Sequence, residues 1–371
     1  MNANSKKKLY KIMSIDGGGV RGIIPAIVMK ALEKKFRKKT GNPDAYLVDY
    51  LDMVGATSLS SIFGLLLLVP EEKGSCRPKY SAHDACDIFL DYLPRIFQTT
   101  LYHQIRTLRG LRDEKYPADF LEDMLDKYFD DYYLSELLLP CTVVSYDIQR
   151  RQSIFFTRHI AREESGKDFL VKDVCRASSS APTYFELAYI TSKSGVRYPC
   201  IDGAVVANNP SMCTVAEART FFKVKPDELS LLSLGSGIDE RPYFYNEVLN
   251  FGVVGWVKPL ISFIMSSNSE ISHHFSQLTF DASNVSENYL RIDTSLKTMT
   301  PDMSSEIDDI SPGNIAGLIE FGQELVEKED HKIEKYVEKV LESRILTPEE
   351  KMADQRIRIQ KEAEQSQDEP G

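Results

Sequence analysis

Long hydrophobic runs are what this sequence most clearly lacks. The longest apolar stretch, Ile62 to Val69, is far shorter than the roughly 20 residues that a membrane-spanning helix requires. The N-terminal segment MNANSKKKLYKIMSIDGGG reaches three glycines before an apolar signal region develops. We therefore expect no transmembrane helix, no cleavable signal peptide and a cytoplasmic protein.

An excess of basic residues is also missing. Lys and Arg total 45 against 55 Asp and Glu, so the formal net charge is -10. A chain of this balance repels a phosphate backbone unless one face is locally basic. Nucleic acid is not expected as a partner.

Paired cysteine and histidine spacings are absent as well. No CxxC or HExxH occurs, and none of the six histidines lies beside a glycine or at a predicted strand end. We expect no metal and no disulfide framework, and interpret the cysteines as free, mostly buried thiols. They are Cys76, Cys86, Cys141, Cys175, Cys200 and Cys213.

What the sequence does have is an alternation of short apolar runs with helical periodicity. Strands are predicted at 9–15, 52–56, 141–146, 153–157, 196–201 and 229–234, and helices at 23–39, 59–69, 82–98, 117–129, 213–222 and 312–346. This order favours an α/β fold with a largely parallel sheet. We expect one large domain over 1–346, followed by a charged tail over 347–371.

The first glycine-rich loop follows a predicted strand and opens a predicted helix. Residues 17–22, GGGVRG, satisfy GxGxxG, which in this context is the fingerprint of a dinucleotide site. The acidic residue expected about 20 positions later is missing, since 39–46 read KTGNPDAY. The backbone amides of such a loop can bind any anion, so they could bind the oxyanion of a reaction intermediate as well as a pyrophosphate.

Ser58 lies between a predicted strand and a predicted buried helix. A serine at this junction is the geometry of a nucleophile elbow, although Thr57 or Ser58 could equally be an ordinary helix N-cap. Asp202 follows another strand and precedes Gly203, where it can act as a general base or form an Asx turn. With no suitable histidine, a Ser-Asp dyad is the simpler catalytic hypothesis.

Five separated motifs occur together in one order. They are DGGGVRG at 16–22, ATSLSS at 56–61, SSSAPTYF at 178–185, IDGAVVANNP at 201–210 and LLSLGSG at 231–237. In order and spacing the chain resembles the patatin-like phospholipase family over roughly residues 10–300, and the segments 251–265 and 289–293 extend the likeness.

The resemblance implies a three-layer α/β fold with a mostly parallel central sheet flanked by helices. It also implies a Ser-Asp dyad that cleaves the acyl esters of phospholipids or other lipids without histidine, metal or organic cofactor. Ser58 becomes the nucleophile and Asp202 the base. The backbone of Gly17, Gly18 and Gly19 becomes the oxyanion hole, and Arg21 helps to shape that loop.

The nucleophile motif departs from the GxSxG pattern usual in this family. Ala56 and Ser60 replace its two glycines, and glycine is preferred where backbone and side chains approach closely. Our leading hypothesis is a lipid acyl hydrolase of the phospholipase A type. The alternative is a catalytically impaired relative that binds lipid or a protein partner, and a dinucleotide-dependent enzyme is the third possibility.

A lipid hydrolase is expected to make peripheral contact with membranes, and three segments could provide it. Residues 62–69 are expected in the core, because they follow the nucleophile directly. Residues 251–265, with Phe251, Trp256, Phe263 and Ile264, are the better candidate. We nevertheless expect them to be packed, since large apolar residues are usually buried. The basic segment 34–39 could touch anionic lipid or form a solvated helix face. The sequence does not identify an activating protein.

Overall fold

The computed structural model describes residues 9–98, 115–298, 303–343 and 345. The predicted charged tail at 347–371 lies outside the described residues. In the described part, eight strands form one mixed sheet. They are β1 (Tyr10–Ile15), β2 (Met53–Thr57), β3 (Cys141–Asp147), β4 (Gln152–Thr157), β5 (Ala188–Thr191), β6 (Arg197–Asp202), β7 (Leu229–Leu234) and β8 (Tyr289–Ile292).

The sheet has the strand order β5-β6-β3-β2-β1-β7-β8, and β4 pairs with β3. Strands β3, β2, β1, β7 and β8 run parallel, in line with the predicted largely parallel sheet, whereas β4, β5 and β6 are antiparallel to their neighbours. Strands β5 and β8 were not predicted, because each has only four residues and gives too short a pattern to identify.

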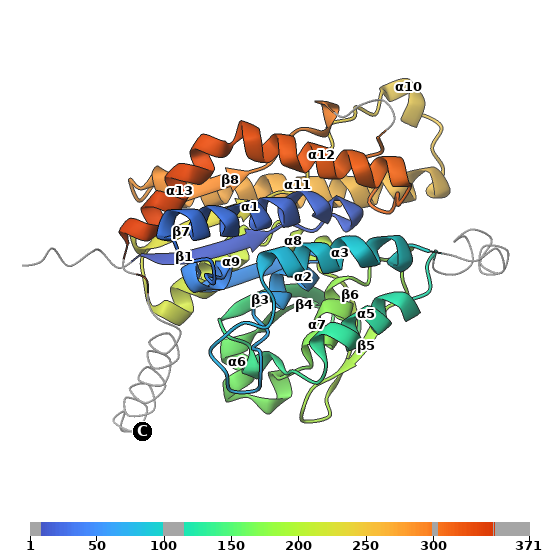
Figure 1. The fold of residues 1–371 in the computed structure, drawn as a ribbon. Coiled ribbons are helices and arrows are strands. Elements are labelled where there is room, and N and C mark those ends of the chain that lie inside the picture. Colours follow the sequence, from blue (N-terminus) through green and yellow to red (C-terminus); the bar gives the residue numbers. More distant parts are fainter. Residues whose placement is uncertain (1–8, 99–114, 299–302, 344, 346–371) are drawn as a thin grey trace, which may run out of the picture.

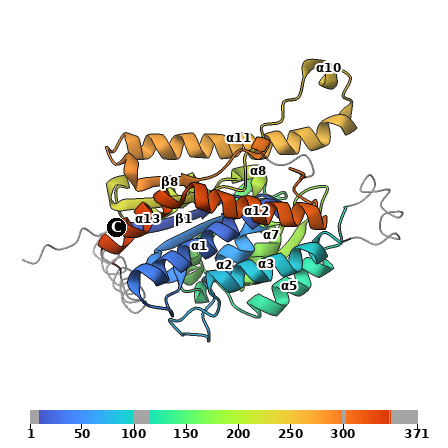
Figure 2. The same ribbon diagram turned by 45° about the horizontal axis from the view of Figure 1, so that its top comes forward.

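Helices cover both faces of the sheet. One face carries α1 (Ile23–Thr40), α2 (Ser60–Leu66), α3 (Ala82–Ile96), α5 (Asp119–Phe129), α7 (Val171–Ser178), α12 (Pro312–Lys328) and α13 (Asp330–Glu342). The other carries α9 (Ser211–Phe222) and α11 (Val253–Asp281). Figure 1 shows α1 and α12 side by side, and Figure 2 shows α11 apart from them at the outer edge of the molecule. Short helices α6 (Arg158–Glu163), α8 (Ala204–Ala207) and α10 (Tyr245–Val248) lie in connections.

Side-chain alternation along the strands explains the three layers. In β1, Met13 and Ile15 enter the large core beneath α1 and α2, while Tyr10 and Ile12 enter a smaller core with α9 and Phe280 of α11. A strand buried on both faces reads as a continuous apolar run, as β1 does. The three-layer α/β prediction is confirmed.

The helix prediction missed α7, α11 and the short helices α6, α8 and α10, and two of the predicted helices have clearly different bounds. The helix predicted at 59–69 is confined to α2, although 62–69 are buried as expected. The helix predicted at 312–346 divides at Glu329 into α12 and α13.

The structure also shows whether the candidate membrane-contact segments are exposed or engaged in other contacts. In the basic segment, Lys35 and Lys39 pair with Glu334 of α13 at 2.8 and 2.6 Å, so internal ion pairs engage both lysines. The expectation that 251–265 is packed was wrong, because the first half of α11 has a largely exposed apolar face. No helix within the described ranges is long and apolar enough to cross a bilayer.

The six cysteines are confirmed as free thiols. Cys86, Cys141, Cys175 and Cys200 are buried, whereas Cys76 and Cys213 are partly buried. Burial raises the pKa of the Cys86 thiol to about 11 and that of Cys213 to about 11. These groups therefore pack as small apolar side chains at neutral pH.

Gly55 in β2 provides a test of this packing. A Cβ atom there would collide with the Oγ1 of Thr214 in α9 and lie 3.0 Å from its Cβ. We expect Gly55→Ala to lower the free energy of unfolding by about 3 kcal/mol, the upper range for overpacking. Urea denaturation monitored by circular dichroism measures this change. Gly313→Ala is the matched control, because nothing lies within 4 Å of the added Cβ, and an equal loss in both variants would contradict the packing argument.

Candidate active site

Ser58 occupies a sharp turn between β2 and α2. Its φ angle is 58°, a left-handed conformation that is uncommon for a residue other than glycine. The Ser58 N–H donates to the Oγ of Ser178 at 2.9 Å, and its carbonyl accepts from the Oγ of Ser61 at 2.6 Å. Hydrogen bonds to both backbone groups therefore hold the strained residue in place.

Asp202 meets Ser58 because of how two strands share β3. Strand β4 lies along one edge of β3, and the other edge is divided end to end between β2 and β6. Thr57, the last residue of β2, pairs with Val144, while Asp202, the last residue of β6, pairs with Ser145. The ends of β2 and β6 therefore meet at adjacent positions of β3.

The resulting contact joins the two side chains directly. The Ser58 hydroxyl donates to Oδ2 of Asp202 at 2.7 Å, and the Ala204 N–H donates to Oδ1 at 2.7 Å. Burial raises the pKa of Asp202 to about 7, although the hydrogen bonds from Ala204 and Ser58 oppose the shift. A carboxylate with this pKa can accept a proton near neutral pH.

No histidine takes part in the described hydrogen bonds of Ser58 or Asp202. His83, His159 and His273 instead contact Asp87, Glu217 and Tyr289, respectively. His103 lies outside the described residues. In the part of the chain that can be placed, no group of three or more His, Cys, Asp or Glu side chains could hold a metal ion.

The glycine loop follows β1 and borders the same site. The Gly17 N–H already donates to the Asn208 carbonyl at 2.8 Å, so it differs from the other two members of the predicted oxyanion hole. The Gly18 and Gly19 amides have no acceptor among the described residues. A Cβ at Gly18 would collide with Ser236, and Gly19 has a φ angle of +59°, so both positions require glycine.

Arg21 supports this loop from behind. Its side chain is buried, and Nη1 donates to the Gly237 carbonyl at 3.5 Å. Burial lowers the pKa of the guanidinium, while Asp239 and Asp293 oppose that shift. The Nε of Arg21 is buried with no hydrogen-bond partner among the described atoms. The residue thus ties the glycine loop to the loop that follows β7.

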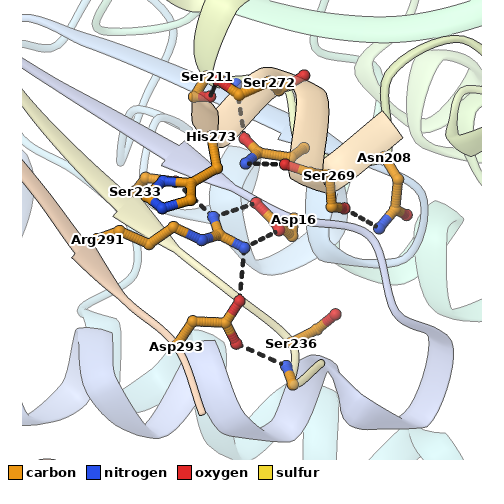
Figure 3. A network of polar contacts seen from close by, with 12 residues as sticks. Asp16, Asn208, Ser211, Ser233, Ser236, Ser269, Ser272, His273, Arg291 and Asp293 are labelled. Carbon is orange, nitrogen blue, oxygen red and sulfur yellow. Dashed lines mark hydrogen bonds and ion pairs between the residues drawn. The ribbon is translucent and has the colours of Figure 1, made fainter. Parts of the chain in front are cut away.

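The sequence interpretation missed a second anchor, which Figure 3 shows around Asp16. Arg291 of β8 donates through Nη2 to Asp16 at 2.7 Å and to Asp293 at 2.5 Å, and through Nη1 to the hydroxyl of Ser233 at 2.7 Å. Asp293 in turn accepts from the Gly237 N–H at 3.0 Å. These bonds join the C-terminal ends of β1, β7 and β8. The only available signal was two aspartates following strands, with no indication that one arginine joins them.

An apolar cavity of about 70 Å³ opens above the dyad. Ser58, Asp202 and Gly19 contribute to its wall, and the remaining lining is mostly aliphatic and aromatic. The apolar part includes Leu59, Phe97, Ala181, Pro182, Tyr184, Phe185, Ala204, Val205, Ile261, Ile264, Met265 and Ile307. The candidate nucleophile, the candidate base and Gly19, whose amide has no acceptor among the described residues, thus border a space suited to a hydrocarbon chain.

A larger polar cavity of about 420 Å³ lies on the other side of the glycine loop and shares Met265 with the apolar one. Its lining includes Asp16, Arg21, Asn208, Ser236, Asp239, Glu270, His273, Arg291 and Asp293. The loop therefore separates an apolar space from a polar one.

The two replaced glycines do not prevent the elbow from forming. Ala56 and Ser60 are fully buried, and the turn at Ser58 closes between them. The Ser60 hydroxyl has no hydrogen-bond partner among the described atoms, so it does not compete for the bonds that hold Ser58.

The dinucleotide hypothesis is not supported by the next strand. In a dinucleotide fold the second strand ends in an acidic residue that binds the ribose. Here β2 ends at Thr57 and leads into Ser58.

Removing Arg291 tests the second anchor. We expect Arg291→Gln to lower the free energy of unfolding by about 3–5 kcal/mol, because two buried carboxylates lose their cation. Burial already raises the pKa of Asp16 to about 6, and loss of Arg291 raises it further, so protonation relieves the penalty at low pH. Urea titrations should therefore show a larger loss at pH 8 than at pH 5.5. Lys297→Gln removes a mostly exposed pair and serves as the control; equal losses in the two variants would contradict the role of Arg291.

Comparison with known proteins gives a consistent result. Residues 13–212 match the family model described as "Patatin-like phospholipase". The chain is 29% identical to "Patatin-like protein 2" of Oryza sativa subsp. indica, covering 87% of this chain and 85% of the relative. It is 29% identical to "Patatin-like protein 1" of Arabidopsis thaliana, covering 86% and 81%. It is 27% identical to "Probable inactive patatin-3-Kuras 1" of Solanum tuberosum, covering 86% and 87%.

Among solved structures, VipD from Legionella pneumophila aligns with a TM-score of 0.35 and 10% sequence identity, covering 86% of this chain and 67% of that one. That likeness is too distant to inform the site. The family match covers more than half of the chain and includes the glycine loop, Ser58 and Asp202. The chain belongs to the patatin-like phospholipase family.

Proposed function

We propose that this protein is a lipid acyl hydrolase of the phospholipase A type, which cleaves fatty-acyl esters of phospholipids or other acyl lipids. The observation that carries the proposal is the 2.7 Å hydrogen bond between the Ser58 hydroxyl and the Asp202 carboxylate in the wall of an apolar cavity. Family membership supports the same reaction class.

In the acylation half-reaction, Asp202 accepts the hydroxyl proton as the Ser58 Oγ attacks the ester carbonyl carbon. The tetrahedral intermediate then collapses, the bond to the alcohol oxygen breaks, and Asp202 returns the proton to the leaving alcohol. In deacylation, Asp202 takes a proton from water, whose oxygen attacks the acyl-serine. The fatty acid leaves, and Ser58 recovers its proton.

The oxyanion is stabilised by backbone amides. Gly18 and Gly19 are the proposed donors, since their N–H groups have no acceptor among the described residues. Gly17 has a supporting role, because its amide already donates to Asn208. Each donor of this kind typically contributes about 3 kcal/mol to transition-state stabilisation. The buried Arg21 helps to keep the loop in position through its contact with the Gly237 carbonyl.

The two cavities suit the two parts of a lipid ester. The acyl chain is placed in the apolar cavity that contains Ser58, and the polar part of the substrate is directed toward the polar cavity beyond Met265. An amphiphilic ester is thereby favoured over a uniformly polar one. Besides the substrate and one water molecule, the scheme uses side chains and amides of this chain.

A second candidate is a catalytically weak protein that binds lipid or a protein partner. The observations that favour it are Ala56 and Ser60 in the nucleophile motif, together with a relative whose name describes it as probably inactive. It predicts the same apolar cavity with an unreactive Ser58. Reactivity of the serine therefore separates the two candidates.

Covalent labelling by a fluorophosphonate probe tests the proposed function without a choice of lipid. We expect labelling at Ser58, located by mass spectrometry of the modified peptide, and complete loss in Ser58→Ala. Asp202→Asn should slow labelling by roughly 100-fold or more, because it removes the general base. Labelling of Ser60→Gly is the matched control, and its rate should equal that of the wild type, since the Ser60 hydroxyl contacts no polar partner.

An unlabelled wild-type chain that is folded by circular dichroism would contradict the hydrolase proposal and favour the binding candidate. A rate that rises strongly in Ser60→Gly would show that the altered elbow limits the wild-type serine.

The pH dependence of labelling tests the role of Asp202. The carboxylate can accept a proton only when it is ionised, and burial raises its pKa to about 7. The labelling rate should therefore increase about tenfold per pH unit below pH 7 and level off above it. Asp202→Asn should give a slow rate with no inflection near pH 7. An inflection near pH 4 in the wild type would contradict the buried-base assignment.

A further inference from the structure

Helix α11 is packed with its polar side inward. The Ser269 Oγ accepts from Asn208 Nδ2 at 3.0 Å, and Ser276 lies 2.9 Å from the Ser211 hydroxyl. Ser276 is fully buried, and Met265 and Phe280 complete the inward side. A surface helix normally presents its apolar side to the protein. This helix uses serines there instead.

The outward side of α11 carries the apolar residues. They are between 37% and 84% exposed and follow one another at three or four positions, with one gap of seven positions between Ile264 and Ile271. We call these residues the outer stripe: Val253, Val257, Leu260, Ile264, Ile271, Phe275 and Leu278. Figure 2 shows this helix at the outer edge of the molecule, with no other element on its far side in that view. The outer stripe therefore has two apolar segments with the exposed Ser267 between them, and no element within the described ranges covers it.

Helix α10 extends this surface. Phe244, Tyr245 and Leu249 are 62%, 74% and 59% exposed, and Figures 1 and 2 both show α10 projecting from the body beside the start of α11. From Phe251 to Ser269 the sequence contains a single charged residue, Lys258, although 27% of the whole chain is charged. An apolar, nearly uncharged surface of this length marks an interaction site.

The outer stripe is continuous with the candidate active site. Ile264 belongs to the stripe and also lines the apolar cavity above Ser58, together with Ile261 and Met265 of the same helix. Val205 of α8 is the other exposed residue of that lining. The cavity therefore opens between α8 and α11, beside whatever covers the outer stripe.

We propose that the outer stripe and α10 dock onto the surface of a zwitterionic lipid bilayer, with α11 lying in the plane of the interface. This inference rests on the proposed function, because a bilayer at this position supplies acyl chains to the cavity. A second copy of the chain would instead obstruct the entrance. The stripe also lacks the regular charged flanks that direct helix pairing in coiled coils.

The charge of the protein favours a zwitterionic bilayer over an anionic one. The net charge of -10 opposes an anionic surface, and the basic segment at 34–39 is engaged through Lys35 and Lys39 in pairs with α13. Binding through the stripe is therefore driven by apolar burial, as for amphipathic helices that lie in a membrane interface. Such binding is insensitive to salt, since screening affects only charges.

The single tryptophan of the chain, Trp256, lies within α11 and reports on docking. The experiment uses full-length Ser58→Ala, so that no substrate is consumed, with vesicles of dioleoylphosphatidylcholine. We expect a blue shift of tryptophan fluorescence, quenching by brominated acyl chains, and equal binding at 0.1 and 0.5 M salt.

Adding Val253→Asp and Leu260→Asp to this protein should weaken vesicle partition at least tenfold, since both side chains are exposed stripe residues outside the cavity lining. Ile148→Asp is the matched control, because Ile148 is an exposed apolar residue in the turn between β3 and β4. It should partition like Ser58→Ala alone. Circular dichroism checks that each variant is folded.

Three outcomes would overturn the proposal: no fluorescence shift and no quenching, partition that the stripe substitutions leave unchanged, or partition that 0.5 M salt abolishes. Sedimentation velocity without vesicles identifies the competing occupant. A dimer that the stripe substitutions dissociate, with no binding to vesicles, would assign the stripe to a second copy. Fluorophosphonate labelling is measured separately. Vesicle binding without labelling of Ser58 would therefore contradict the hydrolase proposal and still support the docking surface.

Discussion

The division of one edge of β3 between two opposed strands is the constraint on which the candidate site depends. Strand β2 runs parallel to β3 and ends opposite Val144, and β6 runs antiparallel and ends opposite Ser145. Two residues 144 positions apart in the sequence thereby face each other at 2.7 Å. Antiparallel β6 is what permits this, because a parallel strand would enter from the same end as β2 and deliver its terminal residue elsewhere.

Burial gives the dyad its chemistry, and the same burial requires the surrounding anchors. Removing Asp202 from water raises its pKa to about 7, which makes the carboxylate a useful base without a neighbouring histidine. Beside it, the glycine loop crosses the carboxyl ends of the strands, where Asp16 is also buried. Arg291 pairs with both Asp16 and Asp293 and so ties the start of the glycine loop, at the end of β1, to β8. The burial of Asp202 and the anchoring of the proposed oxyanion loop are therefore consequences of one arrangement.

Local patterns were sufficient to predict the parts of the site that depend on short segments. The glycine loop, the elbow at Ser58 and Asp202 each follow a recognisable strand, and the fold class follows from the alternation of elements. The pairing of Arg291 with Asp16 joins residues 275 positions apart, so no local spacing encodes it. The orientation of α11 was misjudged for a different reason. Apolar content normally indicates burial, but here the hydroxyls of Ser269 and Ser276 match polar groups of Asn208 and Ser211, and the apolar side faces outward.

The packing of α11 also explains why a helix on the outside of the molecule influences the position of the glycine loop. Asn208 donates from its side chain to Ser269 of α11 and accepts at its backbone carbonyl from the Gly17 N–H. A Cβ on Gly17 would lie 2.6 Å from Asn208 Oδ1 and 3.1 Å from the Cβ of Ser58. Gly17, Asn208 and Ser58 are therefore packed too closely for a side chain at position 17. Ser269 thus helps to fix the position of the glycine loop through Asn208. An apolar inward face could not make that hydrogen bond, and this requirement leaves the apolar residues of α11 for the outside.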